Sequence, residues 1–195
     1  MLDRIGDEVA RATSIVRYAP GSSFTQHTHG GGEEYFVLDG IFQDDEGDHP
    51  TGEYVRNPPT SAHTPYTNPG CTIFVKLWQM KPEDRKQVNI DMKAAAADPA
   101  SGASTLYKND EEHVYVQMLA PGQVLKVDAA GGAEMFLIAG TARDEEGGEV
   151  LRKESWMRLP AGTAAASVAA GDNGATVWVK EGHLLRPRGI DLAAK

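Results

Sequence analysis

The second half of the 195-residue chain repeats the first half, and this repeat restricts the fold more than any other feature of the sequence. The segment EEYFVLDG at 33–40 is echoed by AEMFLIAG at 133–140, and GCTIFVK at 70–76 returns as GATVWVK at 174–180. An Ala-Pro-Gly turn precedes each first segment, and an acidic turn follows it. Agreement of several features in the same order predicts two homologous units of about 95 residues each.

Each unit reads as short strands separated by turns. The segment CTIFVKLWQM at 71–80 is rich in β-branched and aromatic residues, which is typical of a strand. Gly and Pro together number 32 (21 + 11), about 16% of the chain against an average of about 12%. We therefore expect an all-β fold of the sandwich or barrel type, with one unit at 1–92, an Ala-rich linker at 93–104 and the second unit at 105–195.

Charge and hydropathy exclude several classes of partner. The net charge of −9 gives no basic surface for nucleic acid. No apolar stretch reaches the 18 or so residues that a membrane span needs, and the N-terminus is too polar for a signal peptide. The single cysteine, Cys71, can form no disulfide within the chain, and we expect a cytoplasmic protein.

Histidines and carboxylates are the only side chains left to hold a metal ion, because one cysteine cannot build a thiolate site. His27 and His29 are two residues apart, so in a strand they face the same side, about 6.5 Å apart along the chain. The glycines at 30–32 allow a sharp turn that can bring Glu33 back to the same place. His63 follows a Pro-Pro turn and would come from another strand. We expect these residues to form one metal site.

The other three histidines lie outside this pattern. We expect His49 to be solvated in its acidic turn, and His113 and His183 to be surface or strand-edge residues.

The string Gly21-x5-His27-x-His29-x3-Glu33-x6-Gly40 resembles the first cupin motif, and His63 ends a loose second motif. The chain is most similar to the cupin domain of ChrR-type anti-sigma factors, over most of 10–82 and more weakly over 110–185. The resemblance implies two tandem jelly-roll cupin β-barrels, a bicupin, with one divalent metal ion per chain. The implied ligands are His27, His29, Glu33 and His63. Glu34 competes with Glu33, but strand alternation puts the two on opposite faces, so only one can be a ligand.

The sequence departs from that family in two places. Thr60 replaces a glycine of the second motif. The chain also begins almost at the cupin segment, without the cysteines of the family's N-terminal zinc domain that binds the sigma factor. We therefore do not expect a sigma factor as partner.

The second unit has lost the ligands. At an offset of 101 residues, the positions that correspond to His27, His29, Glu33 and His63 are Asp128, Ala130, Glu134 and Ala164. Two carboxylates alone make a poor transition-metal site, so we expect this unit to be structural.

Two functions fit the expected site. An iron, manganese or nickel ion with open positions would suit an enzyme of the dioxygenase type that acts on a small carbonyl or enol compound. Zinc closed by four protein ligands would suit a non-catalytic sensor or regulatory cupin. We favour the enzyme, with Tyr35 as a candidate catalytic residue, because alternation puts it on the face of Glu33, and Tyr54 as a weaker one. We interpret Arg56 and Lys76 as surface charges, and expect a small-molecule ligand and a homodimer.

Overall fold

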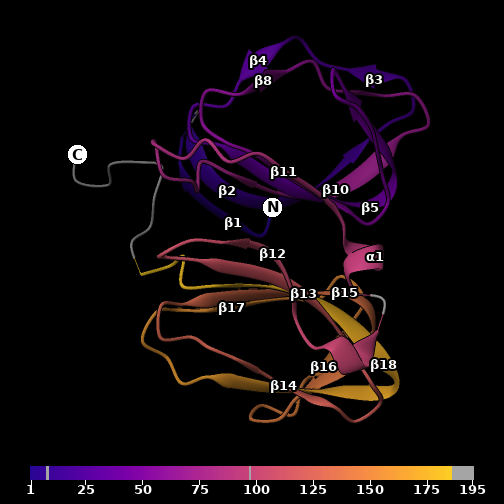
Figure 1. Ribbon diagram of the computed structural model, residues 1–195, viewed down its shortest axis with the longest axis vertical. Helices are drawn as coiled ribbons and strands as arrows, with labels where there is room; N and C mark the ends of the chain where they lie inside the picture. Colours follow the sequence, from indigo (N-terminus) through magenta and orange to yellow (C-terminus); the bar gives the residue numbers. More distant parts are fainter. Residues whose placement is uncertain (8, 97, 186–195) are drawn as a thin grey trace. The chain divides into compact units, whose positions relative to one another are not determined.

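The computed structural model describes residues 1–7, 9–96 and 98–185, and its regular structure is almost entirely β (Figure 1). The all-β fold expected from the sequence is confirmed. The chain divides into two compact units, the first at Met1–Asp91 and the second beginning at Met92. Within the described residues, no helix is long and apolar enough to cross a membrane.

The first unit is a curled antiparallel sheet with a separate two-stranded ribbon. Its main path runs β1-β2-β10-β5-β7-β11, with β6 beside β5, β9 beside β3 and β5, and β4 paired only with β8. The strands are β1 (Asp3–Gly6), β2 (Ala10–Tyr18), β3 (Ser22–Ser23), β4 (His27–Thr28), β5 (Glu33–Asp44), β6 (Gly47–Pro50), β7 (Glu53–Asn57), β8 (Ala62–His63), β9 (Tyr66–Thr67), β10 (Cys71–Leu77) and β11 (Val88–Asp91).

The second unit has a similar strand order. Its main path runs β12-β13-β18-β15-β16, with β14 beside β18 and β17 beside β15. The run β13-β18-β15-β17 in this unit corresponds to β2-β10-β5-β7 in the first unit. The helix α1 (Met92–Ala95) begins one residue before the segment 93–104 that we expected as a linker, and the 3-10 helix η1 (Pro99–Ser101) lies within that segment. The strands are β12 (Ser104–Lys108), β13 (His113–Leu119), β14 (Val124–Val127), β15 (Ala133–Asp144), β16 (Val150–Arg152), β17 (Trp156–Leu159) and β18 (Ala166–Glu181).

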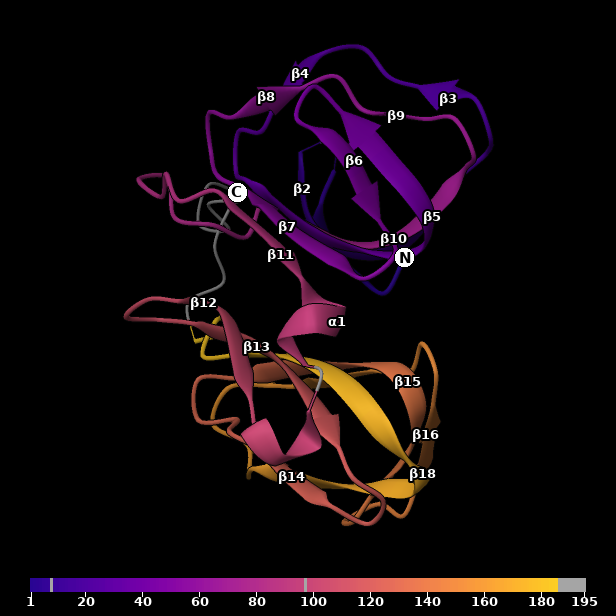
Figure 2. The ribbon, with the colours of Figure 1, turned by 45° about the vertical axis from the view of Figure 1, so that its right-hand side comes forward.

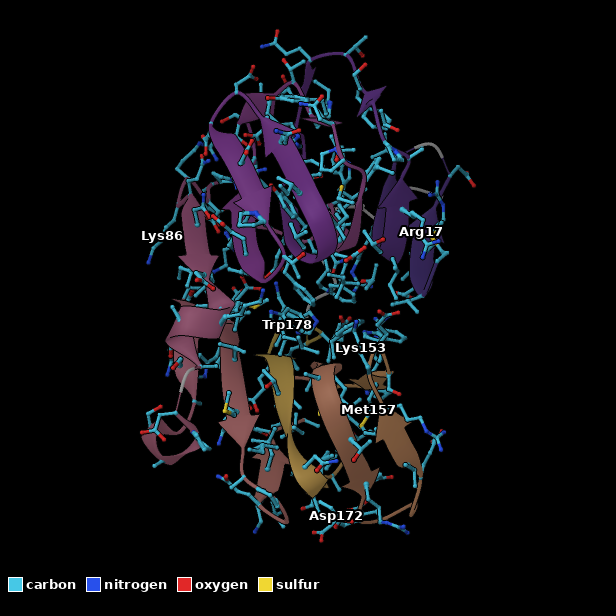
Figure 3. The ribbon with its side chains drawn as sticks, turned by 90° about the vertical axis from the view of Figure 1, so that its right-hand side faces the viewer. Arg17, Lys86, Lys153, Met157, Asp172 and Trp178 are labelled. Atoms are coloured by element: carbon cyan, nitrogen blue, oxygen red, sulfur yellow. The ribbon has the colours of Figure 1, made fainter. Side chains whose placement is uncertain are left out.

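Each unit has its own apolar core. In the first unit, alternate residues of β5 face one cluster, which Tyr35 and Val37 share with residues of β7 and β10. In the second unit, the corresponding residues Met135 and Leu137 of β15 face a larger cluster, and Met157, labelled in Figure 3, is partly buried against it. The period-2 alternation of each strand therefore selects which side chains line the interior.

A bend at Gly40 carries β5 from one part of the sheet to another. Residues 33–40 of β5 pair with β10, and residues 41–44 pair with β6, which runs beside β5 in Figure 2. Gly40 has φ 75°, and a Cβ there would lie 2.1 Å from the carbonyl oxygen of Gly70. Gly140 has φ 80° and the same relation to Gly174. Only glycine has both the left-handed backbone and the missing side chain that this bend requires.

Candidate metal centre

The three histidines expected to bind metal lie together at one end of the first unit. His27 on β4 is the direct partner of His63 on β8, and the two strands run side by side in Figure 1. His29 follows β4, and its backbone N–H donates to the carbonyl of Ser61. Each histidine offers one ring nitrogen, and these three nitrogens lie within 4.8 Å of one another. Among the described residues, this is the one group of three or more His, Cys, Asp or Glu side chains whose ligand atoms lie close enough together to hold one metal ion.

Hydrogen bonds at Nδ1 orient all three imidazoles. His27 Nδ1 is 3.1 Å from the carbonyl oxygen of Thr25, and His63 Nδ1 is 2.9 Å from Asp44 Oδ2. His29 Nδ1 is 2.9 Å from Ser61 Oγ, whose own proton goes to the carbonyl of Pro58. A carbonyl, a carboxylate and a hydroxyl oxygen that has already given its proton can only accept. Each Nδ1 therefore carries a proton, and in the neutral ring Nε2 holds the lone pair.

Glu33 completes the group, and Glu34 points away from it. Glu33 Oε2 lies 3.4 Å from His29 Nε2 and 3.6 Å from His63 Nε2. The side-chain amide of Asn57 donates to this oxygen at 3.2 Å. Burial raises the pKa of Glu33, against the pull of His63 and of the Asn57 hydrogen bond. Glu34, on the opposite face of β5, accepts a 2.6 Å hydrogen bond from Tyr54, so the expectation that Tyr54 belongs to the site is wrong.

The donor set and its spacing fit a metal ion. The Nε2 atoms of His29 and His63 are 3.2 Å apart. Two ligand atoms about 2.1 Å from a shared ion, at an angle of about 90–109°, are separated by about 3.0–3.4 Å. Three imidazoles and one carboxylate are ligands that zinc, iron, manganese and nickel accept. Burial, with His63 and His27 nearby, lowers the pKa of His29 to about 4, which keeps this imidazole neutral at physiological pH.

Asp44 and His49 adjoin the site, although we expected His49 to be solvated in its acidic turn. Asp44 is the buried last residue of β5 and contacts His63 and His49. His49 is 2% exposed, so the expectation that it is solvated is wrong. The signal that could have placed it is the hairpin register, because His49 of β6 is paired with the apolar Phe42.

The interior next to the site is aromatic. The ring of Phe42 lies 6.0 Å from that of His63 and 4.9 Å from that of Tyr35. Tyr35 is completely buried, and its hydroxyl has no hydrogen-bond partner within the part of the chain that the structure describes. Burial, with Glu33 and Asp44 nearby, raises the pKa of Tyr35 well above its usual value. The hydroxyl therefore stays protonated and can donate to a ligand.

Trp78 supports the glycine loop that joins His29 to Glu33. Its backbone N–H donates to the carbonyl of Gly32, and a Cβ on Gly30 or Gly31 would lie 2.5–2.6 Å from its indole ring. Trp78 has φ 60°, whereas Gly182, which makes the same bond to Gly132 in the second unit, has φ 88°. A tryptophan therefore occupies a backbone conformation that the second unit leaves to glycine.

The structure corrects the alignment of the second unit. Glu134 is paired with Lys180 and Arg158, as Glu34 is paired with Lys76 and Arg56, so Glu134 corresponds to Glu34 and Ala133 corresponds to Glu33.

The hydrogen bonds of the loops shift the histidine positions as well. The carbonyl of Gly132 accepts from Gly182 N–H as that of Gly32 accepts from Trp78, which gives this loop an offset of 100. Ala129, and not Ala130, therefore replaces His29. Thr163 donates to the carbonyl of Pro160 as Ser61 donates to that of Pro58, which puts Ala165, and not Ala164, in the place of His63. The expected offset of 101 was therefore wrong at these positions. Ala133, which takes the place of Glu33 in the second unit, has no side-chain atom that could bind a metal.

The remaining candidates divide between surface and interior. His113 is half-buried at the start of β13 and contacts Thr105 Oγ1 at 2.9 Å. The expectation of a surface position is wrong for His183, whose side chain is 4% exposed, with Nε2 3.4 Å from Glu134 Oε1. It is also wrong for Arg56, which is buried in a 2.6 Å ion pair with Asp84, and for Lys76, which donates to Thr13 Oγ1.

Comparisons with known proteins agree with this fold. Residues 1–81 match the family described as ChrR Cupin-like domain. No curated protein matches the sequence significantly. Among solved structures, a Cupin 2 conserved barrel domain protein from Leptotrichia buccalis is similar with TM-score 0.66 and 12% identity, over 91% of this chain and 86% of that one.

Two further solved structures have functional descriptions. A bacterial pirin from Escherichia coli in complex with nickel(II) has TM-score 0.64 and 16% identity, over 87% of this chain and 82% of that one. A salicylate 1,2-dioxygenase from Pseudaminobacter salicylatoxidans has TM-score 0.65 and 11% identity, over 86% of this chain and 69% of that one. Residues 1–81 thus match a ChrR cupin-like domain, and the chain as a whole shares its fold with these solved structures.

Proposed function

We propose that the first unit binds one divalent metal ion through His27, His29, His63 and Glu33. The observation that supports this most directly is the pair of Nε2 atoms of His29 and His63, 3.2 Å apart. Both Nδ1 atoms already donate their protons, so two lone pairs face one another, and a shared cation would relieve their repulsion. The buried carboxylate of Glu33 beside them supplies charge that such a cation needs.

We further propose that the site is an enzyme of the dioxygenase type for a small carbonyl or enol compound. A bound iron, manganese or nickel ion would supply a Lewis acid that can chelate an enolate and a redox centre for dioxygen. Tyr35, two residues from Glu33 on the same face of β5, would donate a hydrogen bond to an oxygen of the ligand. Phe42 would exclude water from it. The fold shared with a dioxygenase and a nickel-bound pirin supports this proposal.

The alternative is a zinc sensor related to the ChrR-type cupin domains. The match of residues 1–81 to that family favours it, and four protein ligands can complete a tetrahedral zinc site. In that case the ion would join β4, β8 and β5 and stabilise the first unit.

Metal content of the purified protein tests the binding site. We expect one equivalent per chain in the wild type, a loss of stoichiometric binding in His63→Ala, and unchanged binding in His113→Ala as the control. A second matched pair separates the two glutamates: Glu33→Gln should weaken binding, whereas Glu34→Gln should leave the stoichiometry unchanged. Full binding by His63→Ala, or no binding by the wild type at any added metal, would show that the site assignment is wrong.

X-ray absorption and dioxygen uptake separate the enzyme from the sensor. Iron, manganese or nickel with solvent in the coordination sphere, together with dioxygen consumption in the presence of a β-dicarbonyl, is the expected result. Tetrahedral zinc without a solvent ligand, and no dioxygen consumption with any of the other three metals, would favour the sensor.

The second unit has a structural role in our proposal. We propose that the chain is a bicupin whose second unit binds no metal, with the linker at 93–104, and that it works in the cytoplasm as a homodimer. The buried free thiol of Cys71 agrees with a reducing compartment. Native mass spectrometry would measure the number of chains and of metal ions together.

A further inference from the structure

We propose that Asp44 and His49 form a positioning pair that holds His63 in the orientation and tautomer required of a metal ligand. This inference rests on the metal site proposed above and names the residues outside it that set its affinity. Neither residue belongs to the motif that identifies the site.

The two oxygens of Asp44 have different partners. Oδ2 accepts from His63 Nδ1 at 2.9 Å. Oδ1 lies 3.1 Å from His49 Nε2 and also accepts from the backbone N–H of Glu46 at 2.9 Å. Because a carboxylate oxygen accepts, this 2.9 Å contact fixes the proton on Nδ1 of His63 and leaves Nε2 free for a metal.

His49 in turn holds Asp44. Its ring is buried, with Nε2 toward Asp44 and Nδ1 3.7 Å from Glu53 Oε1. The side-chain nitrogen of Asn89 lies 3.5 Å from the same Nδ1. A buried histidine with a carboxylate at each ring nitrogen has little rotational freedom. His49 therefore limits the movement of Asp44, which in turn limits the movement of His63.

The second unit provides a comparison within the same chain. Asp144 ends β15 as Asp44 ends β5, and its Oδ1 likewise accepts from the backbone N–H two residues on, that of Glu146. Its Oδ2, however, accepts from the backbone N–H of Gly147 at 3.0 Å. Asp144 thus uses both oxygens within its own turn, whereas Asp44 gives one to His63. The turn alone does not require the contact with His63.

The test compares metal affinity in Asp44→Asn and Asp144→Asn, by chelator competition with Zn²⁺ and by the visible spectrum of the Co²⁺-loaded protein. Loss of an outer partner of a metal ligand typically weakens binding by about 10–100-fold. We expect a weakening of this size and an altered Co²⁺ spectrum in Asp44→Asn, and neither change in Asp144→Asn. Equal affinity and equal spectra in Asp44→Asn and the wild type would overturn the inference, while absence of metal binding by the wild type would instead overturn the proposed function.

Two substitutions of His49 keep the inference testable if Asp44→Asn does not fold. Gln retains a side-chain N–H that can donate to Asp44 Oδ1, whereas Leu retains only volume. We expect His49→Leu to weaken Zn²⁺ binding and alter the Co²⁺ spectrum, and His49→Gln to restore both toward the wild type. Urea unfolding of the metal-free variants measures the purely structural effect. If Leu and Gln give the same affinity and the same spectrum, His49 has no positioning role.

Discussion

The bend at Gly40 should control both the stability of the first unit and its affinity for metal. Residues 33–44 of β5 would span about 36 Å if the strand were straight. Instead, both ends reach one imidazole, because Glu33 Oε2 lies 3.6 Å from His63 Nε2 and Asp44 Oδ2 lies 2.9 Å from His63 Nδ1. The strand must therefore curl, and Gly40 is where its pairing changes from β10 to β6.

Gly40→Ala is the perturbation, and two effects add to its cost. An L-residue in the left-handed conformation, with φ 75° here, costs about 1–2 kcal/mol. The new Cβ would also lie 2.1 Å from the Gly70 oxygen and 2.9 Å from the Cα of Cys71, which are backbone atoms that cannot rotate away. Overpacking of this kind costs about 1–3 kcal/mol more. We expect a destabilisation of about 2–5 kcal/mol, together with weaker metal binding.

Gly21→Ala is the matched control, because Gly21 also has φ 75° but no atom within 4 Å of the position of its Cβ. It should cost only the conformational part, about 1–2 kcal/mol. Hydrogen exchange read by mass spectrometry measures the stability of each unit separately. In a thermal melt, each kcal/mol lost from the free energy of unfolding should lower the melting midpoint of a unit this size by about 4–8 °C. Gly140→Ala should destabilise the second unit and leave metal affinity unchanged. Equal losses in Gly40→Ala and Gly21→Ala would refute the reasoning.

Two further predictions concern His29 and the loop after it. In the metal-free protein, NMR should give His29 a pKa of about 4 against 6.5 for the unfolded chain, so its contribution to stability is present above pH 6.5 and is lost as the pH falls toward 4; a His29→Gln variant with the same slope of stability over this window would contradict this. Trp78→Gly should relieve about 1–2 kcal/mol of left-handed strain. It should nevertheless weaken metal binding and speed amide exchange at Met80, whose N–H donates to the carbonyl of Gly31, because the indole no longer supports the loop. Unchanged affinity and exchange would exclude that role.

Local sequence patterns determined the repeat, the all-β class and the residues brought together at the candidate site. Two histidines spaced i, i+2 face the same side of any extended segment. The glycines that follow them allow a tight turn that brings Glu33 back to the same place. The partition of Glu33 and Glu34 to opposite faces of β5 follows from the same period, and the contacts of Glu33 with the histidines agree with it.

Tertiary structure alone decided what surrounds these residues. In the sequence, His49 directly follows the acidic run at 44–48, which is typical of a solvated turn. Asp44 reaches His63, 19 residues away, only because β5 curls at Gly40. The register of Glu134 and the burial of His183 depend on which strands pair. Such pairings join residues far apart in the chain, and no local period encodes them.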